Sequence, residues 1–293
     1  MKKVCFDGFA VPILLLLPQM AIVLVFFLWP SAQAVWSSFH LEDPFFGRAI
    51  FVGFDNYLNA VTRSDYVRSA WFTLGFSAAV AFFSLAIALT LAVSADAVLR
   101  GQGPYKTLLM WGYAIAPPVA GLIGVMMFDQ HVGPIVDFFA LFGWEMRIGV
   151  NYWDTAVSMT IVATWKQIPV NFIFFLSGLQ GIPNALREAA SIDCRSPARR
   201  FWTIVFPLLA PTTFFLLVIN ITYAFFETFG VIDVMLKGNP GNSPVTLVYK
   251  VFLDGFRGQD IGGSSAQSVI LMLAVFALTV IQFRFIDRRV HYA

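Results

Sequence analysis

The sequence is short of the residues that a soluble domain, a disulfide scaffold or a metal site needs. Only 12% of its 293 residues are charged, whereas about a quarter are charged in a soluble globular domain. Cys5 and Cys194 are too few for a disulfide framework. The scattered His40, His131 and His291 match no metal-ligand spacing. A net charge of +2 is too small to indicate a nucleic-acid partner.

Apolar residues are abundant instead, at 58% of the chain, and 32 phenylalanines cannot be hidden in one water-soluble core. An α-helix needs about 20 apolar residues to cross the hydrocarbon of a membrane. Six stretches are long and apolar enough to be such helices, at about 9–29, 71–93, 107–128, 156–178, 203–226 and 268–283. The stretches are continuous, without the two-residue alternation of barrel strands. The sequence therefore predicts an all-α polytopic membrane protein, with residues 1–293 forming a single transmembrane domain of six helices.

Basic residues indicate the orientation of these spans, because Lys and Arg accumulate in short cytoplasmic segments. One set of segments is short and holds Lys2, Lys3, Arg100, Lys106, Arg187, Arg195, Arg199, Arg200, Arg284, Arg288 and Arg289. The alternate set is much longer but holds only Arg48, Arg63, Arg68, Arg147, Lys237, Lys250 and Arg257. Both termini are therefore predicted to be cytoplasmic.

The first apolar run has a second interpretation. Lys2 and Lys3 precede it and Ala32-Gln33-Ala34 follows it, a pattern that resembles a secretory signal peptide with its cleavage site. The run of about 21 residues is longer than a signal peptide needs, and Pro12 and Pro18 interrupt it. We interpret it as a retained span, and cleavage would leave five spans in the same orientation.

The cytoplasmic segment at about 179–202 has the pattern of a short surface helix. Pro183 is suited to opening a helix, and Ile182, Leu186, Ala189 and Ala190 follow at helical spacing. Ser196 and Pro197 then have the residue types of the N-cap and first position of a second helix, which Pro207 should kink at the membrane. On physical grounds alone, the first helix could rest on lipid headgroups or pack against another protein.

The same segment resembles the EAA loop of ABC-importer permeases. The family pattern is Glu-Ala-Ala, three residues, Gly, nine residues, then Ile-x-Leu-Pro. The matching positions are Glu188, Ala189, Ala190, Ile204 and Pro207, while Cys194 replaces the Gly and Phe206 the Leu. Glycine adopts a left-handed backbone conformation without steric strain. Cys194 must therefore make this turn with an ordinary φ or adopt a strained left-handed conformation.

This resemblance implies a division of labour among several proteins. In such importers two permease subunits pair as a heterodimer, two cytoplasmic ATPases bind below, and a periplasmic binding protein delivers substrate. Glu188 would be the polar contact to an ATPase, with Ala189 and Ala190 on the packing face. The chain has no Gly-Lys dipeptide and hence no Walker A loop. Partner ATPases would bind ATP and Mg, and this chain would bind no cofactor and catalyse no reaction.

Further segments narrow the resemblance. Those resembling carbohydrate-type (maltose-type) permeases are Gly238-Asn239-Pro240, Thr246-Leu247, Tyr249, Phe252 and Phe256. Those resembling the A-type permeases of the sn-glycerol-3-phosphate branch are Asp43-Pro44-Phe45, Phe51-Val52-Gly53-Phe54-Asp55-Asn56, Trp165-Lys166-Gln167, Tyr223-Ala224-Phe225-Phe226-Glu227 and Ser265-Ala266-Gln267-Ser268-Val269. The similarity implies import of sn-glycerol 3-phosphate or a glycerophosphodiester.

Lys166 is a charge near the middle of the fourth predicted span. A lysine there costs at least about 2.5–3.5 kcal/mol on insertion scales, so it should face a cavity or a partner. It could attract an anionic substrate through its ammonium. It could equally form an internal ion pair, with Glu227 or with the partner subunit.

Other polar residues extend this candidate substrate path. Gln167 and Asn171 follow Lys166 on the same helix, and Asn220, Tyr223 and Glu227 share one face of the fifth span at i, i+3 and i+7. Such a stripe suits an aqueous path, but polar residues also join helices by hydrogen bonds.

The resulting hypothesis is a permease subunit in a bacterial inner membrane that works by alternating access, driven by ATPase partners. The nearest alternative is the same machine carrying a neutral sugar, with Lys166 in a structural role. An ion-coupled secondary transporter would import without an ATPase, which the EAA loop disfavours. A membrane-embedded enzyme is disfavoured because the spans hold no metal-ligand cluster and no nucleophile beside a base.

Overall fold

The computed structural model describes residues 10–42, 48–97, 102–194, 196–237, 241 and 243–286. These residues form helices and one small antiparallel hairpin. The chain falls into two compact units, one made of Met1–Ser64 with Val251–Leu273 and the other of Asp65–Lys250 with Ala274–Ala293. The first contains a long apolar helix and the hairpin, and the second contains the bundle.

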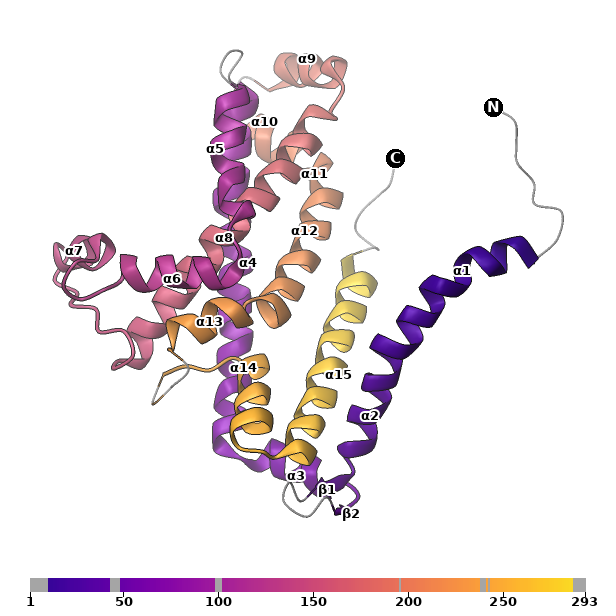
Figure 1. The fold of residues 1–293 in the computed structure, drawn as a ribbon. Coiled ribbons are helices and arrows are strands. Elements are labelled where there is room, and N and C mark those ends of the chain that lie inside the picture. Colours follow the sequence, from indigo (N-terminus) through magenta and orange to yellow (C-terminus); the bar gives the residue numbers. More distant parts are fainter. Residues whose placement is uncertain are drawn as a thin grey trace. The chain divides into compact units, whose positions relative to one another are not determined.

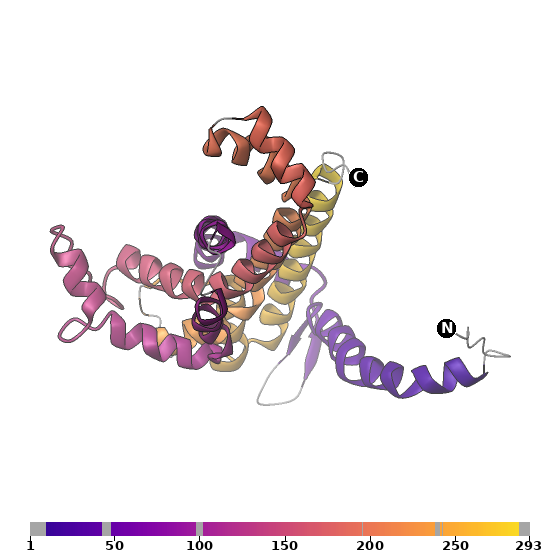
Figure 2. The ribbon, with the colours of Figure 1, turned by 90° about the horizontal axis from the view of Figure 1, so that it is seen from above.

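The first unit begins with one long helical segment. It consists of α1 (Ala10–Val23), the π-helical η1 (Leu24–Leu28) and α2 (Trp29–Ser37), which Figure 2 shows as one continuous curved helix leading to the hairpin. Strands β1 (His40–Glu42) and β2 (Ala49–Phe51) then pair in antiparallel register. Helix α3 (Asp55–Thr62) follows, and η4 (Leu253–Arg257) and the start of α15 (Ile261–Ile286) complete the unit.

Asn56 holds the hairpin against its neighbours. Its side-chain amide donates to the carbonyl oxygens of Ser38 and His40, each at 3.0 Å. A Cβ at Gly262 would overlap the carbonyl oxygen of His40, so α15 can approach the hairpin only with glycine at this position. The segment around Asn56 therefore serves structure in this unit.

The second unit is a helical bundle. Its longer helices are α4 (Ser64–Ala97), α5 (Gln102–Ala114), α6 (Pro117–Met127), α8 (Tyr152–Gln180) and α12 (Ala210–Thr222), and Figure 1 shows α4, α8 and α12 running lengthwise through it. The shorter elements are α7 (Pro134–Ala140), α9 (Asn184–Asp193), α10 (Pro197–Arg200), η2 (Phe201–Val205), α11 (Phe206–Leu208), η3 (Tyr223–Glu227), α13 (Phe229–Met235) and α14 (Leu247–Phe252). Buried apolar residues form its core: Ala88, Ala92, Ala95, Phe172, Phe175, Leu176, Leu179, Leu209 and Leu216.

The described residues contain five helices long and apolar enough to cross a membrane, or six if one bent pair is a single span. Three of them, Ser64–Ala97, Tyr152–Gln180 and Ile261–Arg284, enclose the predicted spans 71–93, 156–178 and 268–283. The all-α polytopic fold class is thus confirmed. Part of the first predicted span, and both chain termini, lie outside the described residues.

The stretch predicted as one helix at 107–128 is instead two helices, α5 and α6, bent by 99°. Ala116 adopts an extended backbone, with φ −62° and ψ 144°, directly before Pro117 and Pro118. A residue before proline is driven out of the helical region, so the break follows from these prolines. The prediction of an unbroken helix was wrong because it used hydropathy alone.

The bend sends α6 across α13. A Cβ at Gly121 would lie 2.7 Å from the carbonyl oxygen of Val231, and one at Gly230 would lie 3.2 Å from the Pro118 ring. Two glycines thus allow close contact between the helices, as small residues commonly do in membranes.

The fifth span begins later than predicted, at Ala210 rather than about residue 203. The predicted disturbance near Pro207 is present as the π-helical η2, the three-residue α11 and an interruption at Leu209. Proline removes a backbone donor and crowds the preceding turn, which explains the irregular helix on both sides.

Candidate functional site

The Glu-Ala-Ala segment forms the helix α9, with Pro183 as its N-cap and Cys194 as its C-cap. Figure 1 shows α9 at one end of the bundle of the second unit, with its axis across the spans. Cys194 has φ −123° and ψ 107°, an extended conformation open to any residue. The turn after α9 is therefore made without the left-handed conformation, whereas Arg195, which follows, lies outside the described residues.

The exposed side of α9 carries two of the three residues that the family resemblance predicts to contact an ATPase. Glu188 and Ala189 are exposed, together with the apolar Leu186 and Ile192, whose exposed fractions are 48% and 85%. Ala190 is only 3% exposed and faces inward. The structure thus separates the two alanines of the motif, and of the two only Ala189 is open to a partner protein.

A cavity of about 440 Å³ lies between α9 and the bundle. Ile182, Ala190 and Ile204 line it, as does Asp96 from the end of α4. Pro207 lies in α11, close in sequence to the lining residue Leu208. Arg187 also lines the cavity and bonds to Asp96, a contact that sequence reasoning did not anticipate.

Lys166 is buried within α8, with an exposed fraction of 8%. Its ammonium donates to the carbonyl oxygen of Tyr113 at 3.1 Å and lies 5.7 Å from the centre of the Tyr113 ring. Tyr113 is in the last turn of α5, where carbonyl groups have no partner within their own helix. Lys166 therefore satisfies a carbonyl that the bend at Ala116 leaves open.

An internal ion pair with Glu227 is the structural alternative for Lys166. Within the described ranges these two side chains form no direct salt bridge, and Glu227 is exposed. The Tyr113 carbonyl could not be identified from the sequence, because it comes from a helix 53 residues away along the chain.

Asn171 and Asn220 are completely buried and bond to each other. Asn171 donates to Asn220 at 3.0 Å, and Asn220 donates back at 2.7 Å. Ser84 joins from α4, bonding to both amides at 3.0 and 2.8 Å. These two candidate path residues, with their hydrogen-bonding groups already engaged, join α4, α8 and α12 as interhelical contacts do elsewhere in membranes.

The remaining path candidates differ in exposure. Gln167 and Tyr223 are each 5% exposed, and the Tyr223 hydroxyl donates to the carbonyl oxygen of Ala163 at 3.4 Å. Glu227 is exposed at the end of η3. The sequence placed Asn220, Tyr223 and Glu227 on one helical face, but the π-helical turn from Tyr223 to Glu227 changes the spacing. Lys166, Gln167 and Tyr223 therefore remain the buried polar candidates.

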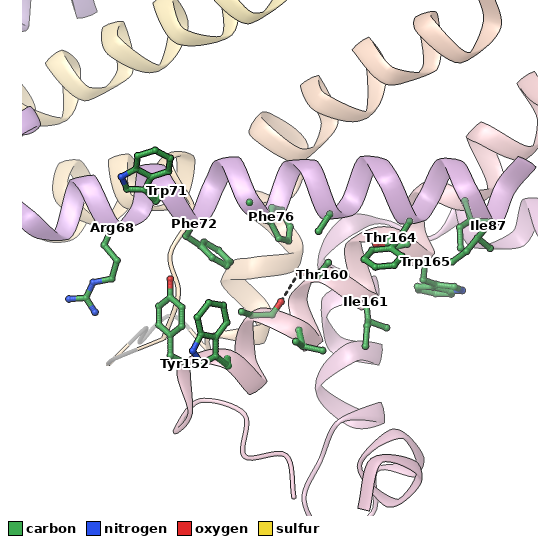
Figure 3. A pocket seen from close by; sticks show the side chains of 17 residues that line it. Arg68, Trp71, Phe72, Phe76, Ile87, Tyr152, Thr160, Ile161, Thr164 and Trp165 are labelled. Carbon is green, nitrogen blue, oxygen red and sulfur yellow. Dashed lines mark hydrogen bonds between the residues drawn. The ribbon is translucent and has the colours of Figure 1, made fainter. Parts of the chain in front are cut away.

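A larger groove of about 1100 Å³ runs between α4 and α8. Figure 3 shows Arg68 and Tyr152 toward one end of it and Trp165 and Ile87 toward the other. Almost all of its lining is apolar, so it suits hydrocarbon rather than a phosphate ester. Sequence reasoning did not identify this groove, although tryptophan and tyrosine near the ends of two spans are typical of a membrane interface.

The described residues contain no group of three or more His, Cys, Asp or Glu side chains placed to hold a metal ion. What they offer chemically is therefore a buried ammonium, buried amides and hydroxyls, and an exposed surface helix.

Comparison with known proteins gives a consistent set of relatives. Residues 76–292 match the family described as binding-protein-dependent transport system inner membrane component. The sn-glycerol-3-phosphate transport system permease protein UgpA of Rhizobium meliloti (strain 1021) is 47% identical, with 100% of both chains covered. The protein of the same description from Yersinia pseudotuberculosis serotype I (strain IP32953) is 47% identical over 96% of each chain.

Solved structures share the fold at lower identity. A chain of a bacterial ABC transporter involved in the import of the acidic polysaccharide alginate matches with a TM-score of 0.82 at 17% identity. The match covers 95% of this chain and 96% of that one. A chain of the MetNI methionine ABC transporter matches with a TM-score of 0.54, over 77% of this chain and 95% of that one. At these identities the likeness concerns the fold alone.

Proposed function

The chain belongs to the family of binding-protein-dependent transport system inner membrane components, and we propose that its cargo is sn-glycerol 3-phosphate or a glycerophosphodiester. It is a multi-pass inner-membrane permease of an ABC importer and has no ATPase domain of its own. The observation that carries the substrate proposal is the 47% identity, over the whole chain, to permeases described as transporting sn-glycerol 3-phosphate.

The proposed assembly contains this chain, a second permease, two cytoplasmic ATPases and a periplasmic binding protein. ATP and Mg are bound by the ATPases. Helix α9 supports the ATPase contact, because it exposes Glu188, Ala189 and two large apolar residues at the surface. The excess of basic residues in the segment that holds α9 supports cytoplasmic termini for the chain.

The proposed mechanism is alternating access. When ATP binding closes the two ATPases, they pull α9, and the bundle opens toward the periplasm. The binding protein then releases its substrate into a path to which Lys166, Gln167 and Tyr223 contribute. ATP hydrolysis lets the ATPases separate and returns the bundle to the inward-open state. This chain therefore contributes binding and movement, and no chemical step.

Lys166 supports an anionic cargo, because a buried ammonium attracts phosphate. Its bond to the Tyr113 carbonyl uses one of three donors and leaves two for a ligand. The same bond supports the second candidate, a neutral sugar or polyol, in which Lys166 stabilises only the bend between α5 and α6. The two candidates differ in whether the charge of Lys166 matters for transport.

The test is ATP hydrolysis by the complete complex in lipid vesicles, with binding protein loaded with glycerol 3-phosphate and then with a neutral sugar. Stimulation by the phosphate ester alone supports the proposal. Stimulation by the sugar alone would assign the cargo to the second candidate and leave the permease role intact.

A further inference from the structure

The guanidinium group of Arg187 connects α9 to the ends of two spans. Its Nη1 donates to Oδ2 of Asp96 at 2.8 Å, and Asp96 is in the last turn of α4. Its Nη2 donates to the carbonyl oxygen of Leu179, in the last turn of α8. The side chains of Arg187 and Asp96 are 34% and 18% exposed. Such charge-assisted hydrogen bonds are stronger than neutral ones.

The bond to Leu179 has a local cause. The last carbonyl groups of a helix lack partners within that helix, and they carry the negative end of its dipole. A cation at this position is therefore stabilised by α8 as well as by the carboxylate of Asp96. One planar guanidinium can serve both acceptors at once, which the single ammonium of lysine does less well.

Packing between α9 and the bundle is incomplete around this connection. The cavity of about 440 Å³ lies there, and Leu186, which also lines it, is 48% exposed. Between the end of α8 and the end of α9, the buried apolar residues are Ile182 and Ala190. A pull on α9 is therefore resisted by the hydrogen bonds of Arg187 together with a small apolar contact.

We propose that Arg187 is the positioning residue through which α9 moves α4 and α8 together. Deeper in the bundle, Ser84 of α4 and Asn171 of α8 are bonded at 3.0 Å, so the two spans are joined at two levels. A displacement of their ends is thereby passed into the bundle. This inference rests on the proposed function, because it assigns a role to α9 when an ATPase pulls it.

The test measures substrate transported per ATP hydrolysed by the complete complex in vesicles. The variants are Arg187→Gln and Asp96→Asn, each of which breaks the ion pair, and the exchange Asp96→Arg with Arg187→Asp, which restores a pair. Arg199→Gln is the control, because Arg199 is an exposed cation on the neighbouring α10. Retention of the ATPases is measured by co-purification.

We expect each single variant to lower transport per ATP about tenfold, with the ATPases retained. The exchange should recover a substantial part of the loss but not all of it, because the bond to Leu179 is not rebuilt. Arg199→Gln should match the wild type. A wild-type ratio in both single variants would overturn the proposal, and so would loss of the ATPases in step with loss of transport.

The identity of the cargo is tested separately, with the wild-type complex. If that complex responds to a neutral sugar rather than to glycerol 3-phosphate, the sugar is used in the same assay. The ratio for the variants then tests Arg187 without reference to the identity of the cargo.

Discussion

Asn171 and Asn220 exchange hydrogen bonds between α8 and α12, with donor–acceptor distances of 3.0 and 2.7 Å. Both side chains are fully buried, and Ser84 connects the pair to α4. When a buried amide loses its hydrogen-bond partner, no bond offsets the free-energy cost of removing that amide from water. The pair therefore fixes the relative positions of three spans.

The replacement Asn171→Leu should destabilise the protein by about 1–3 kcal/mol, because the buried Asn220 N–H that donates to Asn171 loses its acceptor. The double replacement of Asn171 and Asn220 by Leu should cost less than the sum of the two single changes. Thermal unfolding of the purified complex measures this. Thr90→Val is the control, since the exposed Thr90 hydroxyl bonds only within its own helix. Additive costs for the two asparagines would contradict the assignment.

Lys166→Gln should lower transport of glycerol 3-phosphate about tenfold or more, because the amide can still donate to the Tyr113 carbonyl but carries no charge for phosphate. Uptake into vesicles and the yield of assembled complex are compared for the same preparations. Lys106→Gln, which removes a half-buried lysine of α5, serves as the control. Equal losses of yield and transport would mean that Lys166 serves assembly.

Glu188→Lys should leave the membrane domain folded but weaken ATPase association or coupling by about tenfold or more. The reason is that it reverses a charge that the proposed ATPase contact would remove from water. Glu145→Lys reverses an exposed carboxylate in the segment between α7 and α8 and should have no such effect. Stimulated ATP hydrolysis at the wild-type rate in Glu188→Lys would remove α9 from the proposed ATPase contact.

Gly121→Ala and Gly75→Ala should change stability in opposite directions. A Cβ at Gly121 would lie 2.7 Å from the carbonyl oxygen of Val231, so α6 and α13 must move apart at a cost of about 1–3 kcal/mol. A Cβ at Gly75 meets nothing within 4 Å, and alanine favours the helix by up to about 1 kcal/mol. Unfolding of the two purified variants measures the difference, and equal stability would contradict the close crossing.

The apolar spans and the surface helix were predictable because their signals are local. A run of apolar residues determines a membrane span wherever the rest of the chain lies, as for Ser64–Ala97 and Tyr152–Gln180. Pro183 likewise predicts the start of α9, and the Glu-Ala-Ala pattern identifies it. Even the break near Pro207 follows from one residue and its missing donor.

The partners of polar residues were not predictable in the same way. Lys166 reaches a carbonyl of α5 only because the chain bends after Ala114, and Arg187 reaches Asp96 across 91 residues of sequence. The inward position of Ala190 and the outward position of Glu227 depend on what packs beside them and on a π-helical turn.

The sequence by itself thus determined that this protein crosses a membrane, which apolar segments are candidate spans, and where the candidate ATPase-contacting helix lies. Hydrophobic transfer is a property of each segment and adds up along the chain. Only the tertiary structure decided which candidate path residues join helices and which remain available. Hydrogen bonds require atoms within about 3 Å of each other, and that distance is set by the packing of helices far apart in the sequence.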